Sequence, residues 1–189
     1  MIILDLLKYF AKFPNKAGVL DIFHNGKSNY AQYAELKKYM ESLPEGLVPE
    51  IRSFVFGSSL ESVKVRVNKI SGTYLFVDFG EFSCSRDIRN SIEDSQRLAV
   101  TVAMKTTNSA DITEEAIASD ISLELLNKVR GCMLADSEQR ERWLEELSTE
   151  HTIVPFEAAD LNSIGWTLMF DISGSDWFNL KVVSRSFLK

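Results

Sequence analysis

The chain is poor in the residues that most often build catalytic and metal sites. Among its 189 residues are two histidines, His24 and His151, and two cysteines, Cys84 and Cys132. Two cysteines make no disulfide framework, and their spacing matches no zinc-binding motif. We therefore expect two reduced, partly buried thiols and neither a metal nor a cofactor.

Long apolar runs and phosphate-binding glycine loops are also missing. No stretch approaches the roughly 18 apolar residues that a membrane-spanning helix needs. Residues 1–13 carry charges within their apolar start and lack a small-residue cleavage site, unlike a signal peptide. Gly57-Ser58-Ser59 has neither the lysine nor the glycine spacing of a phosphate loop. These absences favour a cytoplasmic protein with no membrane partner.

Strong clusters of basic residues are absent as well. The formal net charge is -6 and the pI about 5.1. An acidic chain repels nucleic-acid phosphates unless it carries a local basic patch. The densest basic groups, Lys37-Lys38 and the segment 64–69, have acidic residues close by, so we expect no nucleic-acid partner.

The sequence does contain enough apolar material for one core. Hydrophobic residues make up 45% of the chain and charged residues 25%, the usual mix for a globular protein. At this length we predict a single domain over 1–189. It divides into a helical N-terminal part at 1–47 and a sheet with two helices at 48–189.

Two amphipathic helices are predicted in the N-terminal part. Apolar residues from Ile2 to Phe13 recur at helical spacing, and Pro14 ends that helix because the residue before a proline avoids the helical region. A second helix is predicted from about 28 to 42. Its apolar face holds Tyr30, Tyr33, Leu36 and Met40.

After Pro49 the pattern changes to that of strands. Residues 51–56 predict one strand. Val63, Val65 and Val67 alternate with polar residues, the period of two expected for a strand with one buried face. Together with the aromatic segment that follows Ser71-Gly72, they predict a β-hairpin over 62–82.

Four further strands are predicted. Residues 97–105 have few charges, which suits the centre of a sheet. Residues 152–156 contain Pro155, which suits an edge. Residues 165–172 place alternating apolar side chains on one face, and 181–187 are the last predicted strand.

The helical segment between these strands begins with a capping signal. Asp111 is a good N-cap, and Glu114 stands three residues later, where its carboxylate can reach back to the amide of the cap. Gly131 is predicted to end or kink the helix, and another helix begins near Asp136. We expect α+β, with helices on one face of a largely antiparallel sheet. The stripe predicted to pack on that sheet is Ile117, Ile121, Leu125 and Val129.

Two carboxylates stand in the middle of aromatic strands. Asp78 lies in Phe76-Val77-Asp78-Phe79, and Asp171 lies in Met169-Phe170-Asp171-Ile172. One interpretation is that both project from the solvent face of the sheet. The other is that they line a shared binding surface or subunit contact.

The loop at 173–178 combines a polar tip with aromatic residues. Asp176, Trp177 and Phe178 are candidates for anchoring a partner, because aromatic residues are enriched at interface hot spots. Alternatively, the two aromatic side chains fold back and close the core.

No pattern in the chain indicates catalysis. Cys84 with a histidine would be a nucleophile and base, but no family signature surrounds it. His151 lies between a helix and a strand, where a cation near a helix C-terminus is favourable. We therefore predict that the protein is not an enzyme.

From about Arg97 onward the chain resembles bacteriophage tail terminator, tail-completion and head–tail joining proteins. The strand LAVTVAMK, the helix DITEEAIASDISLELLNKVRGCML and the strand GWTLMFDISG carry the resemblance. It implies a structural assembly subunit of a phage or prophage tail, present in the cytoplasm or in a phage particle. The implied partners are copies of itself, as a homo-oligomer, and other tail or connector proteins. The hairpin at 62–82 and the loop at 173–178 are the candidate contact surfaces.

Two other function classes stay open. A small-molecule or peptide binding module predicts an enclosed apolar pocket with a few convergent polar groups. An enzyme predicts a cleft in which Cys84 or the strand carboxylates lie within hydrogen-bond reach of another catalytic group.

Overall fold

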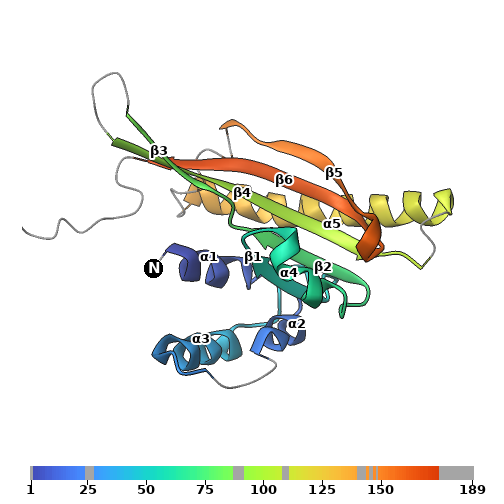
Figure 1. Cartoon of the computed structure of the whole chain (residues 1–189), viewed down its shortest axis with the longest axis horizontal. Coiled ribbons are helices and arrows are strands. Elements are labelled where there is room, and N and C mark those ends of the chain that lie inside the picture. The colour runs from blue at the N-terminus through green and yellow to red at the C-terminus, as the bar shows by residue number, and fades with distance from the viewer. Residues whose placement is uncertain are drawn as a thin grey trace, which may run out of the picture.

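The computed structural model describes residues 2–23, 28–86, 92–107, 111–139, 144, 147 and 149–174. Within this part of the chain, six strands form one sheet in the order β1-β2-β4-β6-β5, with β3 also paired to β4 (Figure 1). β1 and β2 are parallel, and the other described pairs are antiparallel. The predicted α+β class is confirmed. The strands are β1 Ser53–Gly57, β2 Thr73–Asp78, β3 Phe82–Arg86, β4 Ile92–Lys105, β5 Thr152–Ala158 and β6 Ser163–Gly174.

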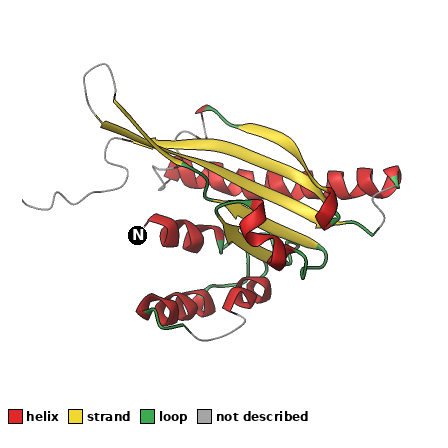
Figure 2. Ribbon diagram, viewed as in Figure 1, coloured by secondary structure: helices red, strands yellow, loops and turns green. Residues whose placement is uncertain are grey.

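Most of the described helices precede the first strand in the sequence. The longest helix lies along one face of the sheet (Figure 2). The longest, α5, runs beside the sheet as a single helix of 28 residues. Gly131 therefore does not end it, and α5 runs on through Asp136, where another helix was predicted to begin. Most residues of that predicted helix after Gln139 lie outside the described residues. The helices are α1 Ile2–Phe10, α2 Lys16–Leu20, η1 Asp21–Phe23, α3 Ala31–Ser42, α4 Leu60–Val67, α5 Ile112–Gln139 and η3 Ala159–Leu161.

The N-terminal helices share a core with the sheet. Phe10 of α1 and Met40 of α3 are fully buried in the cluster that also holds Leu75 of β2 and Met133 of α5. The Tyr9 hydroxyl donates to Asp136 Oδ2 at 2.8 Å, and this bond ties α1 to α5. The two predicted N-terminal helices are confirmed, although α2 was not predicted.

The central and edge strands lie where their sequences predicted. β4 runs between β2 and β6 and is longer than predicted, at 14 residues. β5 is an edge strand, and Pro155 within it is exposed. The predicted strand at 181–187 lies outside the described residues.

The predicted hairpin over 62–82 is wrong, because residues 60–67 form α4. Ser59 caps this helix by accepting from the Ser62 amide at 3.2 Å. Val63 and Val67, four residues apart, are buried against the sheet face opposite α5, whereas Val65 is 74% exposed. Alternate valines satisfied the strand pattern, but the same spacing places two of them on one helical face. α4 is the crossover that the parallel pair β1 and β2 requires.

The predicted buried stripe of α5 is half wrong. Leu125 and Val129 are buried, but Ile117 is 55% exposed and Ile121 is 38% exposed. A helix has 3.6 residues per turn, so a line of steps of four drifts around its axis by about 40° per step. The residues that face the sheet follow the true period instead. They are Ala118, Ser122, Leu125, Leu126, Val129 and Met133.

The predicted N-cap of α5, Asp111, is confirmed. Asp111 Oδ1 accepts from the amides of Thr113 at 2.9 Å and Glu114 at 3.3 Å. The Glu114 carboxylate also accepts from the amide of Thr107 at 2.5 Å, which fastens the end of β4 to the first turn of α5. These contacts fix the first turn of α5 and tie it to Thr107, two residues after β4.

Candidate functional site

Asp78 and Asp171 lie on the sheet face opposite α5 and border the same depression of about 540 Å³. Asp171 Oδ1 accepts from Arg97 Nε at 3.1 Å, and the two residues are cross-strand partners in β4 and β6. This hydrogen bond raises the pKa of Arg97. Asp78 Oδ1 accepts from the Gly80 amide at 2.8 Å and closes the turn after β2. The structure thus brings both carboxylates to one surface, where each has a structural contact.

The other predicted contact residues cannot be placed on that surface. Asp176, Trp177 and Phe178 lie outside the described residues. The predicted contact hairpin at 62–82 does not form, as described above. Their roles at an interface stay predictions.

The His151 ring contacts two neighbours. Its Nε2 accepts from Arg130 Nε at 2.8 Å, and its Nδ1 lies 2.8 Å from the carbonyl oxygen of Leu147. Because a guanidinium only donates, the proton belongs on Nδ1, which then donates to that carbonyl. Through these contacts His151 links α5 to the start of β5.

Cys84 is exposed on β3, whereas Cys132 is half-buried on α5, so only Cys132 matches the expected partly buried thiol. The depression that His151 lines does not include Cys84. His24 lies outside the described residues. Within the described part of the chain, no group of three His, Cys, Asp or Glu residues is placed to hold a metal ion. The described helices include none that is long and apolar enough to cross a bilayer.

A second surface lies where α5 crosses the ends of β2 and β4, and we call it the α5 groove. It is open to solvent, has a volume of about 360 Å³ and includes Met104 from the sheet. Its remaining lining residues are Glu50, Arg52, Gly72, Thr73, Ile121, Glu124, Leu125 and Lys128.

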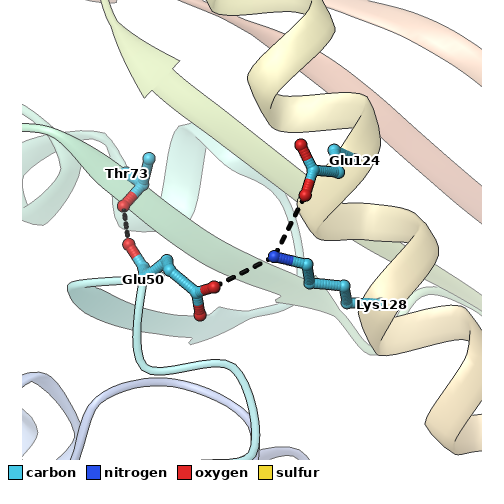
Figure 3. Close-up of polar contacts among 4 residues, drawn as sticks. All are labelled: Glu50, Thr73, Glu124 and Lys128. Atoms are coloured by element: carbon cyan, nitrogen blue, oxygen red, sulfur yellow. Dashed lines mark hydrogen bonds and ion pairs between the residues drawn. The ribbon is translucent and has the colours of Figure 1, made fainter.

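A polar clasp closes one side of the α5 groove (Figure 3). Lys128 Nζ lies 3.0 Å from Glu50 Oε1 and 3.1 Å from Glu124 Oε1. The Thr73 hydroxyl donates to the carbonyl oxygen of Glu50 at 2.5 Å, which holds the segment before β1 against the start of β2. The clasp therefore links α5 to the sheet edge and fixes the charges at the groove.

The clasp shifts the titration of both of its main partners. A backbone hydrogen bond is the larger cause that lowers the pKa of Glu50, and the hydrogen bond from Lys128 is the next. Hydrogen bonds to Glu50 and Glu124 raise the pKa of Lys128. Both groups are therefore charged at neutral pH.

Beside the groove, α5 presents an exposed face that combines apolar and charged residues. We call this the α5 outer face. Ile117 and Ile121 are the apolar members, and Asp120 and Glu124 alternate with them at helical spacing. All six members are exposed, and they are Thr113, Ile117, Asp120, Ile121, Glu124 and Lys128.

The sequence predicted this helix, but it placed the two isoleucines in the core. The sequence held a signal for the exposed position of these isoleucines. On a helix with 3.6 residues per turn, Ile117 and Ile121 fall outside the arc that holds Leu125 and Val129. Comparison of the chain with protein-family models, with curated proteins and with solved structures gave no match.

Proposed function

We propose that this protein is a structural assembly subunit of a phage or prophage tail, of the tail terminator or head–tail joining type, that acts through protein–protein contacts. One observation carries the contact role: Ile117 and Ile121 are exposed side by side on α5, next to an open groove. Burying large apolar side chains is the main gain in protein association. Under this proposal the two isoleucines are covered by another subunit.

The resemblance supplies the tail assignment. The three segments that carry it correspond to β4, α5 and β6. β4 and β6 pair over twelve residues of each strand, and α5 packs on both. The three segments that carry the resemblance are thus packed together as one unit.

The two competing classes have less support from the described residues. A binding module predicts an enclosed apolar pocket, whereas the α5 groove opens to solvent and has charged residues at its rim. An enzyme using Cys84 predicts a nearby base, and both ring nitrogens of His151 already have other partners.

The proposal is tested by self-association of the full chain. We expect sedimentation velocity and negative-stain images to show a closed oligomer at high concentration. Ile117→Asp should raise the concentration of half-association by about tenfold or more, since a buried charge opposes an apolar contact. Val65→Asp is the matched control, because Val65 is exposed on α4 and outside the proposed contact.

Two results would count against this function. One is a full chain that stays monomeric at every concentration tested. The other is an Ile117→Asp variant that associates as the wild type does while keeping its fold by circular dichroism.

A further inference from the structure

The α5 outer face belongs to a strongly acidic part of the chain. Residues 111–127 carry five acidic side chains and no basic one. Lys128 is the first base, and it already contacts Glu50 and Glu124. A helix face that combines two isoleucines with Asp120 and Glu124 suits a partner segment that is both apolar and basic.

The chain itself contains such a segment. Residues 177–189 carry three basic side chains, Lys181, Arg185 and Lys189, and no acidic one. The same stretch has seven large apolar residues, which are Trp177, Phe178, Leu180, Val182, Val183, Phe187 and Leu188. Its chemistry complements the α5 outer face in both charge and hydrophobicity.

The N-terminal part of α5 and Gly174, the last described residue before the segment, lie toward opposite ends of the sheet. Trp166, near the start of β6, contacts Ser119, which lies between Ile117 and Ile121 in the sequence. β6 then runs away from that end to Gly174, which pairs with Asp94 (Figure 1). From Trp166 to Gly174 the strand covers about 26 Å, at about 3.3 Å per residue.

This placement favours a contact between copies. Within one copy, the segment after Gly174 would have to return along the sheet, using about eight extended residues, before reaching Ile121. Between copies, one molecule's Gly174 end meets the next molecule's Ile117 end without any return. Such a head-to-tail contact generates rings or open chains.

We propose that the α5 outer face of one copy binds residues 177–189 of a second copy. This inference rests on the proposed function and names the partner at its contact surface. Ile117 and Ile121 take the apolar side chains of the incoming segment, and Asp120 and Glu124 attract its bases.

Mixing two variants of the full chain tests the head-to-tail contact. The acceptor variant is Ile117→Asp, and the donor variant combines Lys181→Glu with Arg185→Glu. Each alone should be monomeric at concentrations where the wild type associates. Mixed in equal amounts, they should form a one-to-one dimer that does not grow, because one intact acceptor and one intact donor remain.

A charge exchange tests the electrostatic part. Asp120→Lys alone should weaken association by about tenfold. Adding Asp120→Lys to the donor variant should restore association. The lysine on the face would then meet the two glutamates of the segment, so opposite charges would again face each other. Circular dichroism and the urea midpoint of every variant confirm that each remains folded.

The outcomes separate the two proposals. If Ile117→Asp dissociates the oligomer but the donor variant associates as the wild type does, the segment is not the partner, and the assembly role of the face stands. If the mixture stays monomeric, the head-to-tail contact is overturned. If Ile117→Asp has no effect, the inference and the proposed function both fail.

Discussion

Trp166 in β6 donates its indole N–H to both the carbonyl and the hydroxyl oxygen of Ser119 in α5, each at 3.0 Å. The two residues are 47 positions apart in the sequence, and their contact sets which side of α5 faces the sheet. Because Ala118 and Ser122 are buried, Ile117 and Ile121 must face outward. The contact surface proposed for assembly therefore depends on how α5 is rotated on the sheet.

Removing the indole donor should loosen that attachment. We expect Trp166→Phe to lower the free energy of unfolding by about 1–2 kcal/mol, from the lost hydrogen bond and a smaller ring. Ser119→Ala is the control, because it removes only the hydroxyl and should cost less. Urea unfolding followed by circular dichroism measures both. A Trp166→Phe variant as stable as the wild type would show that packing alone fixes α5.

The buried and exposed sides of α5 should differ in how much a substitution lowers the free energy of unfolding. Leu126→Ala should lower the free energy of unfolding by about 2–5 kcal/mol, because the side chain is fully buried and leaves a cavity. Ile117→Ala, on the exposed side, should change it by less than about 0.5 kcal/mol in the monomer. Equal costs for the two substitutions would contradict the rotation of the helix.

Two glycines should respond to alanine in opposite directions. Gly131 lies in the middle of α5 with nothing within 4 Å of an added Cβ, so Gly131→Ala should stabilise the fold by about 0.5–1 kcal/mol. At Gly165 in β6 an added Cβ would stand 2.1 Å from the carbonyl oxygen of Val102. Gly165→Ala should therefore destabilise the fold by about 1–3 kcal/mol. Thermal melts of the two variants give the comparison, and the same sign for both would be inconsistent with these contacts.

The clasp at the α5 groove predicts a pH dependence with two limits. The pKa of Glu50 is lowered by folding, so its contribution is full above about 4.3, the usual glutamate value, and is lost as the pH falls through the lower folded pKa. The pKa of Lys128 is raised, so its contribution is full below about 10.4 and is lost as the pH rises through the higher folded pKa.

Replacing Lys128 tests both limits. The urea midpoint of Lys128→Met should lie below that of the wild type by an amount that is largest around neutral pH and shrinks toward both extremes. In the Lys128→Met background, Glu50→Gln should have a smaller effect than it has in the wild type. A difference between wild type and Lys128→Met that is constant with pH would rule out the clasp as its source.

Local patterns were enough to predict most of the elements. The few charges of 97–105 predicted the central strand, Pro155 predicted an edge, and Asp111 predicted the start of α5, because each signal acts on the backbone within a few residues. The prediction at Val63, Val65 and Val67 was wrong because Val63 and Val67, four residues apart, share a face in a strand and in a helix alike, and only the exposed Val65 tells the two apart. The parallel pairing of β1 and β2, which requires a crossover, decided for a helix.

The candidate site was less accessible from the sequence. Asp78 and Asp171 were singled out because they interrupt aromatic strands, but only strand pairing shows that they border one depression and that Asp171 contacts Arg97. Nothing in the sequence links Glu50 to Lys128, which are 78 positions apart. That contact exists because α5 crosses the ends of β2 and β4.

By itself, the sequence determined the acidic charge, the amphipathic segments and the caps and breaks between them, since these depend on neighbours along the chain. Tertiary structure decided the rest. Whether Ile117 is core or surface is a matter of how far a rigid helix is turned about its axis. That rotation is set by the best packing of Leu126, Val129 and Met133 on the sheet and by the Trp166–Ser119 bond. A pattern of residues along one helix fixes its arc of apolar side chains, but only the sheet surface selects which part of that arc is buried.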